Sequence, residues 1–187
     1  MSDAVMISIR PKWCELIAQG KKTCELRKNR PRIETPFKCF VYMTKGKPEL
    51  IMIERDGDEW YGTIYHGPTN FITLPEGGYG WAHGKRGKVI GEFICDAIAP
   101  VTFDADGVPT LHYIGKATEW RACVTAKEAR KYCGDTAKKG LFAWHISNFV
   151  LYDTPKELKQ YQIPTTYPAR GIRQPPQSWI YAEELTE

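Results

Sequence analysis

The sequence predicts an α+β fold in which strands dominate, built as a small mixed β-barrel with short helices covering its ends. Runs of β-branched and aromatic residues recur at 5–9, 37–44, 88–101 and 140–153, and each predicts a strand. Helical patterns are short, and the connections between elements vary in length. A doubly wound fold would require regular alternation of strands and helices, so the mainly β architecture is favoured.

The N-terminal elements follow from residue spacing. Pro11 suits the first turn of a short helix, and Gly20 supplies its C-terminal stop. A strand, "TCELR", begins directly afterwards. Alternation along this strand places Glu25 and Arg27 on one face, opposite the apolar side chains.

The middle of the chain predicts a hairpin, a loop and two short helices. A polar turn between two apolar runs predicts a hairpin insertion at 49–66, and a glycine-rich loop follows at 75–88. Residues 117–124 form the first helical segment. The second begins after Thr125, a suitable N-cap, with Glu128 at the capping-box position.

Length and composition predict one domain. A chain of 187 residues with 42% hydrophobic content can supply a packed core. No apolar run approaches the roughly 20 residues that span a bilayer, and the N-terminus lacks a secretory signal. We therefore expect a soluble, cytoplasmic protein with no membrane contact. The six cysteines and four histidines lack the spacing of a zinc site, so no metal and no cofactor are expected.

Positive charge is concentrated in the N-terminal part. Between residues 10 and 47 there are 11 Lys or Arg against three Glu, whereas the remainder of the chain is net acidic. Such a distribution is typical of a surface that faces phosphates, because neutralised phosphates release counterions. Ordinary charge alternation for solubility is the alternative interpretation.

Three segments carry a family resemblance. They are "MISIRPKWCELIAQGKKTCELRK", "GKVIGEFICDAI" and "LFAWHISNFVLYDTPKEL", which together resemble the ASCH family of the PUA-like superfamily. The family signature, G-x-K-x-x-E-x-R, is matched by Gly20, Lys22, Glu25 and Arg27.

The resemblance implies a PUA-like barrel of five or six strands in a single domain, 1–187. Its core would be about 4–158, and 159–187 would form a proline-rich C-terminal extension that closes on the barrel. The resemblance also implies a cleft beside the motif that holds RNA or a nucleotide.

Some relatives are similar to amidohydrolases that act on acetylated cytidine, using a lysine and a threonine of the motif. Lys22 matches that lysine, but Glu25 stands where those relatives carry threonine. The resemblance therefore favours binding of RNA or a modified nucleotide. The alternative is a hydrolase with Lys22 and Glu25 as catalytic residues, either an amidohydrolase on an acylated nucleoside such as acetylcytidine or a ribonuclease.

The predicted nucleic-acid site combines the motif with neighbouring cations and with ring faces that stack on bases. The candidates are Lys12, Lys21, Lys22, Glu25, Arg27, Lys28, Arg30, Tyr79, Trp81, Lys85 and Arg86. His145 and Ser147 share one face of a late strand and are further candidates for the cleft. The alternative for the motif charges is a surface ion pair worth at most about 1 kcal/mol, on a convex structural or protein-interaction domain. The sequence predicts no particular protein partner.

Overall fold

The described part of the chain covers most of the predicted elements. In the computed structural model it comprises 4–45, 49–56, 59–66, 85–105, 109–112, 120–134, 140–164 and 171–185, with the backbone alone for the second and third ranges. The helices are α1 (Pro11–Ala18), α2 (Ala126–Cys133) and the 3-10 turn η3 (Leu158–Gln160). The strands are β1 (Ala4–Ile9), β2 (Cys24–Arg27), β3 (Phe37–Met43), β4 (Glu49–Asp56), β5 (Glu59–His66), β6 (Val89–Cys95), β7 (Ile98–Phe103), β8 (Pro109–Leu111), β9 (Leu141–His145), β10 (Ser147–Lys156), β11 (Tyr161–Gln162), β12 (Trp179–Tyr181) and β13 (Glu183–Glu184).

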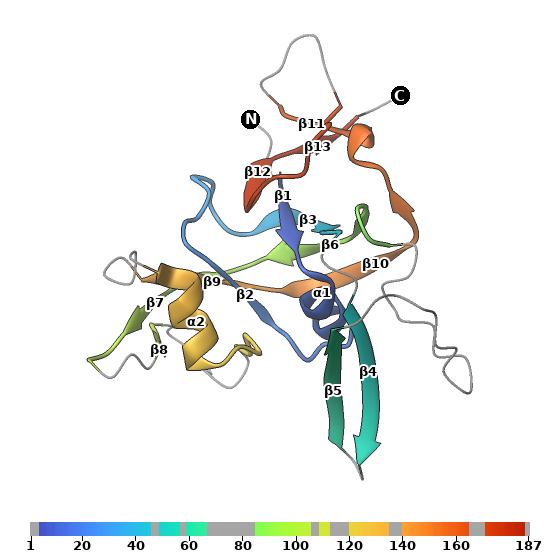
Figure 1. Ribbon diagram of the computed structural model, residues 1–187. Coiled ribbons are helices and arrows are strands. Elements are labelled where there is room, and N and C mark those ends of the chain that lie inside the picture. Colours follow the sequence, from blue (N-terminus) through green and yellow to red (C-terminus); the bar gives the residue numbers. More distant parts are fainter. Residues whose placement is uncertain are drawn as a thin grey trace.

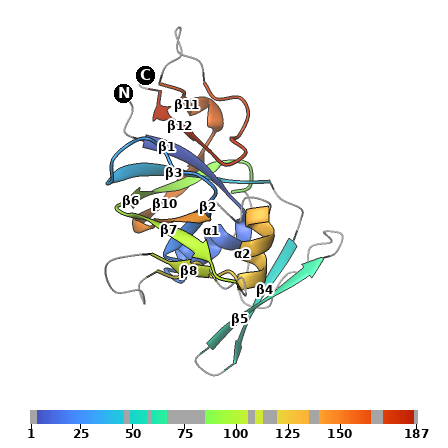
Figure 2. The same cartoon turned by 90° about the vertical axis from the view of Figure 1, so that its left-hand side faces the viewer.

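The strands form two main sheets (Figures 1 and 2). The five-stranded sheet has the order β10-β6-β3-β1-β12, with β1 and β3 parallel and the other pairs antiparallel. The four-stranded sheet, β2-β9-β7-β8, is antiparallel throughout. The predicted α+β, mainly β class is confirmed. Among the described strands, however, hydrogen-bonded neighbours do not close into a barrel.

Two long strands pass from one sheet to the other. β6 leads into β7 across Asp96 and Ala97, and β9 leads into β10 across Ile146. The prediction of one long strand over 88–101 was therefore wrong at Asp96 and Ala97. The strand predicted over 140–153, with a bend near Asn148, is divided at Ile146, and Asn148 itself has a φ of 49°. The two breaks lie side by side, because the His145 amide donates to the Ala97 carbonyl at 2.9 Å and the His145 ring bonds Asp96 at 2.6 Å. The positions of these two breaks thus depend on contacts between strands that are distant in sequence, and a run of apolar residues does not indicate them.

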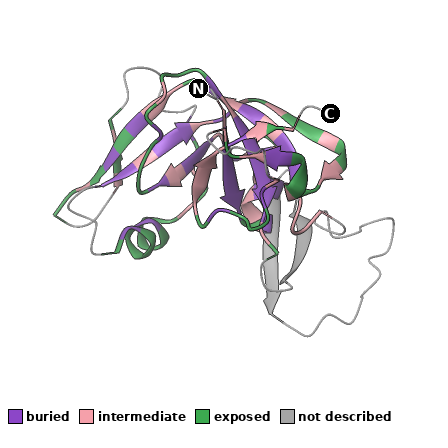
Figure 3. Cartoon of the chain, turned by 90° about the horizontal axis from the view of Figure 1, so that it is seen from above, coloured by how far each residue is buried: buried purple, intermediate pink, exposed green. Residues whose placement is uncertain are grey.

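The core has three parts, and its buried residues concentrate along the central strands (Figure 3). One face of the five-stranded sheet packs against α1 and Trp144. The four-stranded sheet packs against α2. The other face of the five-stranded sheet is covered by C-terminal residues, including Tyr161, Ile172 and Ala182.

Of the predicted helix signals, the stop of the first helix and the capping box of α2 are confirmed, whereas one predicted helix is wrong. Gly20 ends the α1 region with φ +67°, and Thr125 and Glu128 form the predicted capping box of α2. The helix predicted over 117–124 is wrong for the described residues 120–124, which are irregular. Their backbone groups bond the chain after α1, for example the Arg121 carbonyl, which accepts from the Thr23 amide at 2.9 Å.

The remaining insertions lie beside the two sheets. β4 and β5 pair over their full length, from Glu49 opposite His66 to Asp56 opposite Glu59, as predicted, and the hairpin extends away from the body (Figure 1). Most of the predicted glycine-rich loop lies outside the described residues. No helix in the described part of the chain is long and apolar enough to cross a membrane.

Candidate functional site

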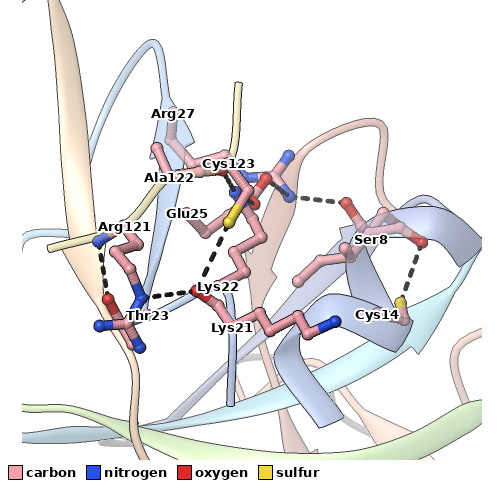
Figure 4. Close-up of polar contacts among 11 residues, drawn as sticks. Ser8, Cys14, Lys21, Lys22, Thr23, Glu25, Arg27, Arg121, Ala122 and Cys123 are labelled. Atoms are coloured by element: carbon pink, nitrogen blue, oxygen red, sulfur yellow. Dashed lines mark hydrogen bonds and ion pairs between the residues drawn. The ribbon is translucent and has the colours of Figure 1, made fainter. Parts of the chain in front are cut away.

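The end of α1 positions the motif. The Lys22 amide donates to the Leu16 carbonyl at 3.0 Å, so the chain reverses directly after the helix. β2 then pairs with β9, which places Glu25 opposite Trp144 and Arg27 opposite Phe142. This local path brings the side chains of Lys22, Glu25 and Arg27 together (Figure 4). We refer to these three residues as the motif cluster.

Glu25 is shared by the two cations of the motif cluster. Its Oε2 lies 3.1 Å from Lys22 Nζ, and its Oε1 lies 3.1 Å from Arg27 Nη2. The three side chains are only 1%, 10% and 7% exposed for Lys22, Glu25 and Arg27. The alternative of a solvated surface ion pair is therefore wrong. Two cations with one carboxylate leave a buried excess of one positive charge.

Further contacts fix both cations in place. The Lys22 ammonium also donates to the Ala122 carbonyl, and it lies 5.0 Å from the centroid of the Trp13 ring. Arg27 donates through Nη2 to the Ser8 carbonyl at 2.7 Å, and its Nη1 lies 3.5 Å from Ser178 Oγ. Its Nε is buried without a hydrogen-bond partner in the described structure. Most of the guanidinium is thus bound by the protein itself, which suits a positioning role.

The segment 120–123 forms a second support for the motif. Arg121 donates to the Gly20 carbonyl at 2.8 Å and to the Lys21 carbonyl at 2.9 Å, and its amide donates to Thr23 Oγ1 at 2.7 Å (Figure 4). These bonds hold the turn between α1 and β2 against the segment 120–123. Sequence reasoning missed this segment because it was assigned to a helix.

A cavity of about 1360 Å³ lies beside the motif cluster. We refer to it as the motif cavity. Lys22, Glu25 and Arg27 line it together with residues of α1, α2, the end of β3 and the C-terminal segment. Eight lining residues are Lys or Arg and three are Glu, so the cavity is strongly cationic.

The predicted site residues divide into three groups. Lys12, Lys22, Glu25 and Arg27 line the motif cavity. Tyr79 and Trp81 lie outside the described residues. The remaining candidates, which do not line it, are Lys21, Lys28, Arg30, Lys85, Arg86, His145 and Ser147.

Several of those outlying candidates have other contacts. Lys28 lies 5.5 Å from the centroid of the Tyr132 ring, and Arg86 donates to the Lys45 carbonyl at 3.1 Å. His145 bonds Asp96 at the corner between the sheets, and Ser147 donates to the Ile94 carbonyl at 3.0 Å. The structure therefore does not bring His145 and Ser147 together with Lys22.

Sequence reasoning missed more than half of the cavity's cations. Five cations line the motif cavity but were not predicted: Arg10, Lys45, Lys131, Lys159 and Arg173. Arg10 and Lys45 belong to the basic region 10–47, but nothing in the sequence distinguished them from the other cations there. The other three come from α2, η3 and the C-terminal segment, where no local motif marks them.

Burial raises the pKa of two groups near the site. It raises the pKa of the Cys14 thiol well above its usual range, and the nearby Glu25 carboxylate raises it further. Cys14 is therefore a neutral thiol at physiological pH, not a thiolate nucleophile. Burial also raises the pKa of Tyr42, with Glu157 contributing. In the described part of the chain, no three His, Cys, Asp or Glu side chains group to hold a metal ion.

No protein-family model and no curated protein matches the sequence. Solved structures do match. A crystal structure of ASCH from Zymomonas mobilis superimposes with a TM-score of 0.54 at 18% identity, covering 96% of this chain and 87% of that one. The chain has an ASCH-like fold. Two point mutants of the Zymomonas mobilis protein have TM-scores of 0.53 and 0.52, at 18% and 19% identity. These two alignments cover 89% and 87% of the mutant chains and 96% of this one.

Proposed function

We propose that this chain binds RNA or a modified nucleotide in the motif cavity, with Lys22, Glu25 and Arg27 at the site. The supporting observation is a buried, net positive cluster that lines a cavity rich in Lys and Arg. Burying charge is unfavourable unless partners compensate it, and a bound phosphate would compensate this excess. The ASCH-like fold supports the same class of ligand, because the family resemblance implies a cleft for RNA or a nucleotide.

The residues of the site would have different roles in binding. Glu25 holds Lys22 and Arg27 in one geometry through its two oxygens. Lys22 has three N–H donors, of which two face Glu25 and Ala122, so one remains for a ligand oxygen. Lys12, which is half-buried above the Trp13 ring, adds a positive charge on α1.

Hydrolysis is the second candidate, since Lys22 and Glu25 form an ion pair and both line the motif cavity. Catalysis would require one of them to act on a substrate as acid, base or nucleophile. Both Glu25 oxygens already accept from cations, and the Lys22 ammonium is held by two acceptors. The arrangement supports a fixed positive charge more than a free base, so we favour binding.

Fluorescence polarisation with a labelled single-stranded RNA of about 10 nucleotides tests the proposal. The test variant is Lys12→Gln, and the matched control is Lys127→Gln, which is exposed on α2 and does not line the motif cavity. We expect salt-sensitive binding by the wild type, with Lys12→Gln lowering the slope of log affinity against log salt by about 0.7. The control should match the wild type.

Absence of RNA and nucleotide binding by the wild type would overturn the proposed function. Equal effects of Lys12→Gln and Lys127→Gln would place binding elsewhere. Incubation with the same RNA and with acetylcytidine, followed by chromatography of the products, tests hydrolysis. Turnover that Glu25→Gln abolishes would replace binding by the hydrolase alternative.

A further inference from the structure

The C-terminal segment 171–177 forms one side of the motif cavity, and we call it the C-terminal strap. Ile172, Arg173, Pro175, Pro176 and Gln177 all line the cavity. Two consecutive prolines restrict its backbone, since the ring fixes φ and limits the preceding residue. The strap is therefore a shaped wall of the cavity.

Both ends of the strap are attached to the sheets. At its start, the Ile172 amide donates to the Tyr161 carbonyl at 2.7 Å, and Gly171 approaches η3 so closely that a Cβ there would lie 2.4 Å from the Lys159 carbonyl oxygen. At its end, Ser8 Oγ donates to the Pro176 carbonyl at 2.6 Å. The structure thus fixes where the intervening side chains lie.

The strap is also connected to the motif. Arg27 donates to the Ser8 carbonyl and contacts Ser178 directly after the strap, while its Nη2 also pairs with Glu25. One guanidinium therefore links the motif cluster to β1 and to the strap. Residues on the strap are held at a constant position relative to Lys22.

Most of the uncompensated charge of the motif cavity resides on residues outside the motif. Its three carboxylates are already paired, Glu25 with the motif cations, Glu128 with Lys12 at 3.5 Å and Glu157 with Lys88 at 3.1 Å. By contrast, five lining cations have no ion pair or side-chain hydrogen bond to another described residue. They are Arg10, Lys45, Lys131, Lys159 and Arg173.

These free cations approach from different parts of the fold. Arg173 follows Ile172, which packs with Tyr161 on the five-stranded sheet. Lys131 lies on α2 between Ala129 and Cys133, which pack with the four-stranded sheet. The volume of about 1360 Å³ also exceeds the roughly 300–1000 Å³ of a typical small-molecule site. A ligand that fills the cavity can therefore meet the two cations with more than one anionic group.

We propose that Arg173 on the strap and Lys131 on α2 bind separate phosphates of one single strand, so the ligand is an oligonucleotide. A nucleoside or a mononucleotide would occupy only part of the cavity. This inference rests on the proposed function and narrows it to a substrate class. Arg173 and Lys131 act as phosphate contacts, which strengthen binding without reading the base.

Binding of cytidine monophosphate and of ribo-oligonucleotides of increasing length tests the inference. The variants are Arg173→Gln, Lys131→Gln and their combination. Arg32→Gln is the matched control, since Arg32 is exposed and does not line the motif cavity. We expect wild-type affinity to rise with length up to about 4–6 nucleotides. Each single variant should weaken binding of the longer strands by about threefold to tenfold, and the double variant should remove most of the length dependence.

The two proposals fail in different ways. If Lys12→Gln weakens RNA binding but Arg173→Gln and Lys131→Gln bind every length as the wild type does, the strap inference is overturned and the proposed function stands. Equal wild-type affinity for monophosphate and oligonucleotide would also overturn it. If no length binds, the proposed function itself fails. Far-ultraviolet circular dichroism of each variant checks that these exposed substitutions leave the fold intact.

Discussion

Two charged clusters in this fold place lysine–glutamate pairs in different environments. The motif cluster lies beside the motif cavity and is almost fully buried. The second, which we call the outer-face cluster, lies on the other face of the five-stranded sheet, beneath the C-terminal segment. It comprises Lys38, Glu92, Tyr152, Lys156 and Glu184.

The clusters also differ in how charge is balanced. In the outer-face cluster each carboxylate has its own lysine, Glu92 with Lys38 at 2.8 Å and Glu184 with Lys156 at 2.7 Å. The Lys38 and Lys156 side chains are 43% and 35% exposed, so water screens their charge. In the motif cluster one carboxylate serves two buried cations. Balanced pairs tie strands together, whereas a buried excess of positive charge is suited to an anionic ligand.

Glu25→Gln should have the largest effect on stability. It removes the only carboxylate between two buried cations, and breaking such a network costs about 3–5 kcal/mol. The matched change, Glu92→Gln, removes a partly exposed carboxylate that pairs with Lys38 and Tyr152, and it should cost about 1 kcal/mol. Urea unfolding of both variants measures the difference. Similar losses would contradict the distinction between the clusters.

The motif cluster was predictable because its spacing is local. A glycine stop after a helix and alternation along a short strand bring Glu25 and Arg27 to one face within three residues. The capping box at Thr125 and the hairpin at 49–66 are local for the same reason. Each depends on neighbours in sequence, so a single chain suffices to predict it.

Contacts between distant residues were not predictable from the sequence. The strap returns to β1 through a bond between Ser8 and Pro176, and no local pattern marks Arg173 as a wall of the motif cavity. The break at Asp96 and Ala97 is not marked either, because apolar residues continue on both sides of it. Burial of the motif cluster belongs to this group. This burial depends on the Ala122 and Ser8 carbonyls, which accept hydrogen bonds from Lys22 and Arg27. The sequence alone is equally compatible with solvent-exposed positions for these two side chains.

Arg27→Lys should have the next largest effect, because it keeps the charge but removes the planar fork. Lysine cannot reproduce the bonds of one guanidinium to Glu25 and the Ser8 carbonyl together with the contact to Ser178. We expect a loss of about 1–3 kcal/mol, measured as a lower urea midpoint. Arg32→Lys, on an exposed side chain, should leave the midpoint unchanged. An unchanged midpoint for Arg27→Lys would show that charge alone holds the motif cluster.

The outer-face cluster should contribute to the loss of stability at alkaline pH. Burial raises the pKa of Tyr152 far above its usual value of 10.0, and the bond to Glu92 raises it further. A pKa that is higher in the folded state stabilises the protein below pH 10 and loses this contribution as the pH rises above 10. Tyr152→Phe should therefore cost about 1 kcal/mol at neutral pH. It should also show a smaller further loss than the wild type between about pH 8 and pH 11.

The same pH series separates the clusters. Tyr161, whose pKa is also raised mainly by burial, remains in the Tyr152→Phe variant, so part of the alkaline loss should persist. Glu25→Gln leaves Tyr152 and Tyr161 unchanged and should retain their part of the alkaline loss, although it removes the contribution of Glu25 to the raised pKa of Cys14. If Tyr152→Phe loses stability above pH 10 as steeply as the wild type, the alkaline loss originates outside the outer-face cluster.

The smallest effect should come from Lys38→Gln. The pair between Lys38 and Glu92 is as short as any ion pair in the motif cluster, but its side chains are 43% and 24% exposed. Water and salt screen such a pair, so we expect a loss of about 0.2–1 kcal/mol at low salt. At about 1 M salt the screening length falls to about 3 Å, and the loss should disappear. The loss caused by Glu25→Gln should persist at the same salt concentration, because salt screens buried charges much less than exposed ones. A salt-resistant loss for Lys38→Gln would mean that contact distance, and not burial, separates the two clusters.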